Sequence, residues 1–222
     1  GLDIEFPFNQ KNYEAFVADY KAGLISDEEL DACAARVLEL VYRCEEMRKT
    51  RKVKRSKQER LAVAREIAQE GMVLLKNDGV LPLCKGTKLS VCGEFAAPGR
   101  CSLVAGGGSA MVPWQGELFN LPKLLGERLG VEVKFDAAFW PKGIGSNWQK
   151  AHKAFLYAEE SDVAIVCAGT GADIECEGND RDSMRLPAVQ ENMILETARR
   201  CSKTVVVLFA GSALDMSAWK DK

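Results

Sequence analysis

The chain has 222 residues, of which 47% are hydrophobic and 28% charged, the ordinary balance of a globular protein. Its net charge of −2 favours neither a nucleic-acid surface nor an anionic membrane as a partner. No apolar run approaches the roughly 18 residues that a membrane span needs, and residues 1–7 lack the basic and apolar stretches of a signal peptide.

Eight cysteines and a single histidine, His152, limit the metal and redox chemistry. No two cysteines are spaced as a CxxC pair, so a zinc site is disfavoured, and we expect neither a metal nor another cofactor. Cys92 and Cys167 lie inside apolar runs, where a reduced cysteine behaves as a small hydrophobic side chain. We therefore expect reduced thiols and a cytoplasmic location.

Residues 1–55 are predicted to be helical and detached from the rest of the chain. Ser26 is a candidate N-cap with Glu29 at the capping-box position, and apolar residues recur at helical spacing after it. The run between Arg48 and Lys57 is strongly basic. In a chain of low net charge, such a run indicates a solvated linker more often than a polyanion site.

A second helix is predicted over residues 58–75, ended by the turn residues Asn77, Asp78 and Gly79. Beyond it, short apolar strands alternate with amphipathic helices. The predicted strands cover residues 89–93, 131–135, 162–169 and 204–211, and the predicted helices cover residues 118–129, 148–160 and 186–201.

This alternation predicts an α/β fold, a doubly wound and mostly parallel sheet with helices on both faces, preceded by a helical arm. Strands that are continuous apolar runs are expected to be covered on both faces. Ligands approach the carboxyl ends of strands in such sheets, which points to the loops after Gly93, Gly169 and Gly211.

Three stretches resemble glycoside hydrolase family 3, the β-glucosidase family. The first is the segment from Arg65 to Asn77 with its continuation Gly79-Val80-Leu81-Pro82-Leu83. The second runs from Glu175 to Arg181 and is followed by Leu186-Pro187 and Gln190. The third is the strand 205–211 with Ser212, Met216 and Trp219. In order and spacing they resemble the family's second, α/β-sandwich domain over roughly residues 60–219.

The resemblance also implies a domain division. Residues 1–57 are similar to the end of the family's (β/α)₈ barrel, its closing helix and a basic linker, and residues 58–222 to the second domain. The family's nucleophile is an Asp in a barrel motif of the type "SDW", which does not occur in this sequence. We therefore expect a piece of a longer enzyme whose partner is its own barrel; a homodimer is left open.

The implied activity is that of a retaining, exo-acting β-glycosidase, which removes terminal sugars from β-linked oligosaccharides or small glycosides. Such enzymes use two carboxyl groups, one as nucleophile and one as acid/base. The resemblance implies that the acidic loop, residues 173–182, supplies the acid/base. The E-x-x-G arrangement before Gly178 selects Glu175, whereas counting back from Pro187 selects Glu177 as the alternative.

Crowding of carboxylates in this loop predicts a raised pKa, which suits a proton donor, and Arg181 could offset part of the repulsion. Composition alone favours a solvated surface loop for these five acids, whereas the position of the loop after an apolar strand and the family resemblance favour a catalytic role. A non-catalytic carbohydrate-binding domain is the alternative function.

The glycine-rich segment 102–113 is a second candidate site. It lacks the Gly-Lys-Ser/Thr ending of a P-loop, which disfavours a nucleotide-binding domain. In the family a similar loop approaches the barrel's sugar site, and glycines permit a close backbone approach. The residues expected to bind substrate are Gly107, Gly108, Ser109, Trp114 and Arg181.

Overall fold

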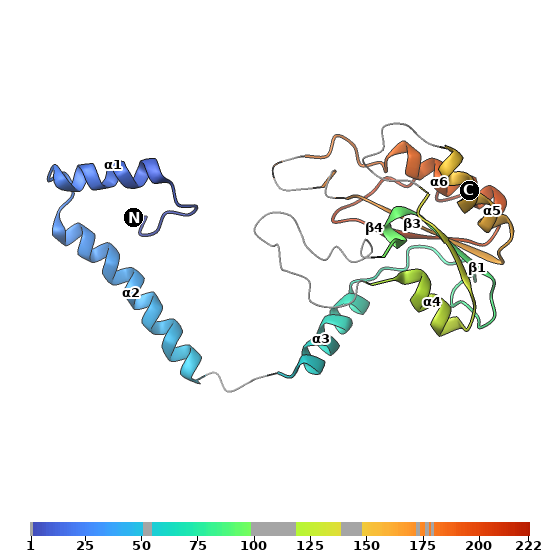
Figure 1. Ribbon diagram of the computed structural model, residues 1–222, viewed down its shortest axis with the longest axis horizontal. Helices are drawn as coiled ribbons and strands as arrows, with labels where there is room; N and C mark the ends of the chain where they lie inside the picture. The colour runs from blue at the N-terminus through green and yellow to red at the C-terminus, as the bar shows by residue number, and fades with distance from the viewer. Residues whose placement is uncertain are drawn as a thin grey trace. The chain divides into compact units, whose positions relative to one another are not determined.

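The computed structural model describes residues 2–50, 55–98, 119–138, 148–171, 174–175, 178 and 180–222. The chain divides into two units, residues 1–73 and residues 74–222, which are described separately (Figure 1). No helix within these described ranges is both long and apolar enough to cross a membrane.

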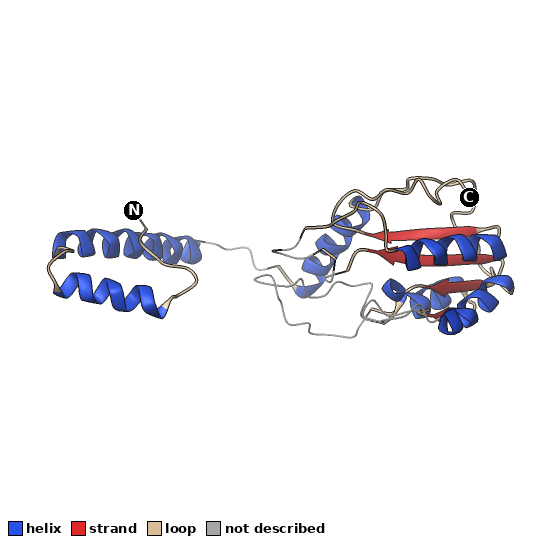
Figure 2. Cartoon of the chain, turned by 90° about the horizontal axis from the view of Figure 1, so that it is seen from above, coloured by secondary structure: helices blue, strands red, loops and turns tan. Residues whose placement is uncertain are grey.

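The first unit is helical, as the sequence predicts (Figure 2). Its helices are α1 (Gln10–Lys21), α2 (Asp27–Thr50) and α3 (Lys57–Glu70). The predicted capping box of α2 is confirmed, because the Glu29 N–H donates to the Ser26 hydroxyl at 3.1 Å and the Ser26 N–H donates to the Glu29 carboxylate at 3.0 Å. Ser56 and Glu59 form the same reciprocal pair at the start of α3.

The prediction that the helix of residues 58–75 continues to Leu75 is wrong. Helix α3 ends at Glu70, and Gly71 is its C-cap. Glycine is a poor helix former, and the β-branched Val73 follows closely, so local propensity opposes a further turn. The sequence pattern missed this because apolar residues continue at helical spacing beyond the glycine.

The helices of the first unit have apolar faces that are open to solvent. None of α1, α2 and α3 has a buried residue. Leu38 and Val41 on the predicted face of α2 remain 53% and 51% exposed, and Ile67 on α3 is 68% exposed. Burial within the described part of this unit therefore contributes little to its stability.

The second unit contains a four-stranded parallel sheet with the strand order β2-β1-β3-β4. The strands are β1 (Leu89–Cys92), β2 (Val133–Asp136), β3 (Val163–Gly169) and β4 (Thr204–Phe209). The helices between them are α4 (Leu121–Leu129), α5 (Trp148–Glu159) and α6 (Ala188–Arg200), and the short 3₁₀ helix η1 (Glu94–Ala96) follows β1. Each predicted strand and helix is present, with ends that differ by a few residues.

Alternating strand residues divide the core into two layers. Val91 and Ile165 pack in one cluster, against which Leu125 of α4 lies. Val166 belongs to the other cluster, with Phe155 of α5 and residues of α6. Helices therefore cover both faces of the sheet, which confirms the doubly wound α/β prediction.

The strand order also fixes where the sheet can present a site. The chain passes from β1 to β2 on one side and then crosses to β3 on the other side of β1, so the topology switches between β1 and β3. All strands are parallel, so their carboxyl ends share one edge of the sheet. A ligand site in such a sheet is expected at this edge, where the acidic loop begins after β3.

Candidate active site

The acidic loop leaves the carboxyl end of β3 through a tight turn. The Ile174 and Glu175 N–H groups both donate to the Gly171 carbonyl, at 2.9 and 2.8 Å. These two bonds hold Glu175 close to the end of β3. The Glu175 side chain is thereby brought back to the sheet edge, where it is 28% exposed.

The Glu175 carboxylate is bound by donors from the ends of two strands. Thr170, the residue after β3, donates its hydroxyl to Oε2. Beyond β4, the Gly211 N–H donates to Oε2 at 3.1 Å and the Ser212 hydroxyl donates to Oε1 at 2.8 Å. Both carboxylate oxygens are therefore occupied as hydrogen-bond acceptors.

Arg181 also lies close to this carboxylate. Its Nη1 is 4.0 Å from Glu175 Oε1, and its side chain is only 15% exposed. Its Nη2 donates to the Ala213 carbonyl at 2.9 Å. Its guanidinium is thus near Glu175 and contacts the segment after β4, whereas its expected role in substrate binding stays a prediction.

These contacts favour the ionised form of Glu175. The hydroxyls of Thr170 and Ser212 and the N–H of Gly211 lower the pKa of Glu175 below its usual value, because all three stabilise the ionised form. The positive charge of Arg181 lowers this pKa further. The expectation of a raised pKa is therefore wrong for Glu175, because these donors outweigh the effect of burial.

The start of α6 is held against the same sheet edge. Gln190 is buried, and its side-chain amide pairs with the backbone of Gly169 at the end of β3. Arg185 donates to both carboxylate oxygens of the buried Glu191, with Nε at 3.0 Å from Oε1. The chain segments on both sides of the acidic loop are therefore anchored.

Several predicted site residues cannot be placed. The candidate acid/base Glu177 and the expected substrate-binding residues Gly107, Gly108, Ser109 and Trp114 lie outside the described residues.

Sequence reasoning missed Thr170 and gave no role to Ser212. Both residues carry a hydroxyl side chain shortly after an apolar strand, on the edge of the sheet where sites are expected. This pattern was the sequence feature by which they could have been found.

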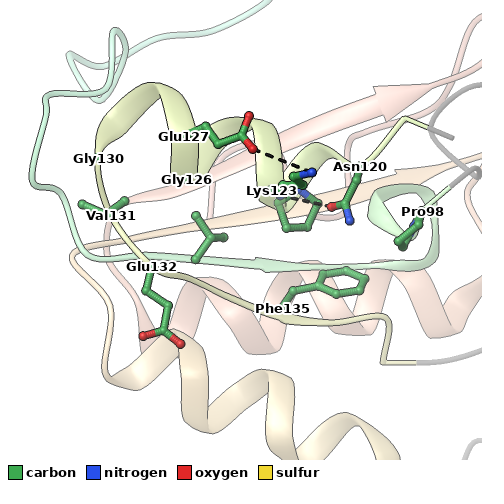
Figure 3. A pocket seen from close by; sticks show the side chains of 11 residues that line it. Pro98, Asn120, Lys123, Gly126, Glu127, Gly130, Val131, Glu132 and Phe135 are labelled. Carbon is green, nitrogen blue, oxygen red and sulfur yellow. Dashed lines mark hydrogen bonds and ion pairs between the residues drawn. The ribbon is translucent and has the colours of Figure 1, made fainter. Parts of the chain in front are cut away.

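An open pocket of about 670 Å³ lies elsewhere, between α4 and the edge strand β2 (Figure 3). Asn120, Lys123 and Phe135 are among its lining residues, and Lys123 pairs with Glu127 at 3.8 Å. None of its described lining residues comes from the acidic loop. Among the residues that the structure describes, no group of His, Cys, Asp and Glu side chains could hold a metal ion.

Comparison with known proteins assigns the family. Residues 72–222 match the family described as the glycosyl hydrolase family 3 C-terminal domain. The thermostable beta-glucosidase B of Acetivibrio thermocellus is 31% identical over 226 residues, which cover 100% of this chain and 29% of that protein. The exo-alpha-(1->6)-L-arabinopyranosidase of Bifidobacterium longum is 28% identical over 229 residues, which cover 99% of this chain and 30% of that protein.

A solved structure agrees with this assignment. The GH3 beta-glucosidase of Bifidobacterium adolescentis superposes with a TM-score of 0.76 at 30% identity, over 99% of this chain and 32% of that one. The chain belongs to glycoside hydrolase family 3 and carries the α/β domain of that family. It spans about a third of the length of the relatives that it matches.

Proposed function

We propose that this chain is part of a retaining, exo-acting β-glycosidase that removes terminal sugars from small glycosides. The observation that carries the proposal is the acidic loop at the carboxyl edge of a parallel sheet, in a chain of this family. The names of the relatives, a beta-glucosidase and an arabinopyranosidase, support a glycoside substrate and leave the sugar open. The free thiols, such as Cys44 and Cys84, support a cytoplasmic location.

The acidic loop is proposed to supply the acid/base, with Glu175 and Glu177 as the two candidates. A general acid must hold a proton at neutral pH, and the lowered pKa of Glu175 works against this. Because three donors already occupy the Glu175 carboxylate, we propose Glu177, the second choice from the sequence, as the acid/base.

Residues 1–57 are proposed to be the end of the barrel, its closing helix and the linker. The open apolar faces of α1 and α2 support this assignment, because a missing barrel would cover them. The chain contains no "SDW"-type nucleophile motif. We therefore expect these 222 residues alone to release no nitrophenol from aryl β-glycosides.

The test uses the whole enzyme with Glu175→Ala and Glu177→Ala compared side by side. Loss of the acid/base should lower the rate on a disaccharide by on the order of 10²–10⁴-fold. An aryl glycoside with an acidic phenol should be spared in its first step, because its leaving group needs no proton. Azide should then restore turnover of the activated substrate, since azide attacks without a general base.

We expect Glu177→Ala to show both the leaving-group dependence and the azide rescue. The same pattern in Glu175→Ala alone would return the assignment to Glu175. If neither variant shows it, the acid/base does not lie in the acidic loop. Turnover by the 222-residue chain above the buffer rate would contradict the need for a barrel nucleophile.

A further inference from the structure

The two described ends of the acidic loop contact one short segment, residues 211–213. At the first end, Glu175 accepts from the Gly211 N–H and from the Ser212 hydroxyl. At the second end, Arg181 donates to the Ala213 carbonyl. These contacts join positions that are 36, 37 and 32 residues apart in the sequence. Neither end of the loop is held only by its own chain neighbours.

We infer that Glu175 and Arg181 are positioning residues, which pin both ends of the acidic loop to the segment after β4 and so set where the loop holds its catalytic carboxylate. The catalytic part of this inference rests on the proposed function. The pinning itself concerns only contacts within this chain, and it can be tested without any activity.

The environment of Glu175 supports a fixed structural contact. Three donors converge on its two oxygens, so little of its accepting capacity remains for a substrate. The segment after β4 also closes tightly on it: a Cβ added at Gly211 would lie 3.3 Å from the Glu175 carboxylate atoms. A residue with a side chain at this position would push against the carboxylate.

Arg181 forms the second contact with the segment after β4. Its Nη1 is buried, has no hydrogen-bond partner among the described residues, and lies 4.0 Å from Glu175 Oε1. Its charge therefore acts on the ionised Glu175 through a partly desolvated gap, while Nη2 holds the Ala213 carbonyl. This arrangement gives Arg181 a structural contact with the segment after β4.

The variant Glu175→Gln distinguishes a positioning role of this residue from a role in proton transfer. Its amide oxygen can accept from the Gly211 N–H and the Thr170 hydroxyl, and its NH₂ group can donate to the Ser212 oxygen. The pin would then remain, although without charge assistance. A neutral amide can neither give nor take the proton that an acid/base must transfer. Alanine at position 175 can neither form these hydrogen bonds nor transfer a proton.

The first experiment measures amide hydrogen exchange of Gly211 in the 222-residue chain. Glu175→Ala should speed this exchange about tenfold or more, the size expected for losing a bond to a charged group. Glu175→Gln should stay close to the wild type. Thr204→Val is the matched control, because the Thr204 hydroxyl donates to the Cys201 carbonyl at the opposite end of β4. Equal Gly211 exchange in wild type and Glu175→Ala would overturn the pinning.

The second experiment measures kcat of the whole enzyme on a disaccharide. Misplacing the acid/base should cost Glu175→Ala on the order of 10²-fold, whereas Glu175→Gln should recover most of the rate. Glutamine as poor as alanine would identify Glu175 as the acid/base and overturn its positioning role. If the whole enzyme hydrolyses no glycoside, the proposed function fails, and the exchange experiment alone decides the pinning.

The pH profile gives an independent readout. The double variant Thr170→Val and Ser212→Ala removes two donors that lower the pKa of Glu175. If Glu175 only positions the loop, kcat/KM should fall at every pH while its alkaline limb keeps the same midpoint. An alkaline limb that moves to higher pH would mean that Glu175 itself is the titrating acid, and would contradict the inference.

Discussion

The side-chain amide of Gln190 pairs with both backbone polar groups of Gly169: Nε2 donates to the carbonyl at 2.9 Å, and Oε1 accepts from the N–H at 2.8 Å. Gln190 is 5% exposed, so the pair is shielded from water. Helix α6 is thereby joined to the end of β3, directly before the acidic loop. One side chain thus serves two backbone groups at the sheet edge that carries the candidate site.

We predict that Gln190→Ala lowers the free energy of unfolding by about 2–5 kcal/mol, because two buried backbone groups each lose a partner at about 1–3 kcal/mol. Urea unfolding of the chain measures this change. Asn192→Ala is the matched control, since Asn192 is an exposed amide on the same helix. Losses of similar size in both variants would mean that helix propensity, rather than the pair with Gly169, accounts for the effect.

Gly93→Ala should be among the most destabilising single changes in the sheet. Gly93 has a φ of 102°, and an added Cβ would lie 2.1 Å from the Cys167 carbonyl oxygen. Gly86→Ala measures the cost of the positive φ alone, because Gly86 has a φ of 84° and no atom within 4 Å of the added Cβ. We expect about 1–2 kcal/mol for Gly86→Ala and about 1–3 kcal/mol more for Gly93→Ala. Equal melting temperatures of the two variants would contradict the close approach.

The ion pair of Asp3 with Arg36 should depend on pH in the acid range. Arg36 donates to both Asp3 oxygens, at 2.7 and 2.6 Å, and lowers the pKa of Asp3 to about 2. A carboxyl group with a depressed folded-state pKa stabilises the folded form above its unfolded pKa, about 4. This contribution is lost as the pH falls from there through about 2.

The carboxyl carbon of Asp3 can be titrated by NMR to check this value. Arg36→Ala should raise the pKa of Asp3 toward its usual value of about 4, and the hydrogen bond with Cys33 should keep it somewhat below that value. Arg43→Ala, which removes an arginine paired with Glu39 on the same helix, should leave it unchanged. If Arg36→Ala leaves the pKa of Asp3 unchanged, the ion pair does not form in solution.

Cysteine reactivity should separate the exposed thiols from the core. Burial raises the pKa of Cys92 to about 12, so its thiolate fraction at pH 8 is on the order of 10⁻⁴. Cys44 and Cys84 are exposed. In native protein, iodoacetamide should modify Cys44 and Cys84 within minutes and leave Cys92 unmodified until urea is added. Mass spectrometry follows each site, and equal rates at Cys84 and Cys92 would contradict the buried position of β1.

Periodicity was enough to locate the elements of the second unit. Each predicted strand between Leu89 and Phe209 is present, because apolar runs between turn residues have few alternatives to a buried strand. The extent to which each strand is buried was less predictable from the sequence. Strands β3 and β4 have similar apolar runs, yet β3 is fully buried and β4 only half-buried, because β4 lies at the edge of the sheet. Strand order depends on contacts between distant segments, which composition does not encode.

The candidate site divides in the same way. The sequence by itself determined the family, the position of the acidic loop after an apolar strand, and Glu175 as a residue of interest. Only the tertiary structure decided which groups surround Glu175, because Ser212 lies 37 positions away and meets it through the pairing of β3 with β4. Those donors lower the pKa that crowding alone was expected to raise. A pKa responds to neighbours in space, and these are set by the fold rather than by adjacency in the chain.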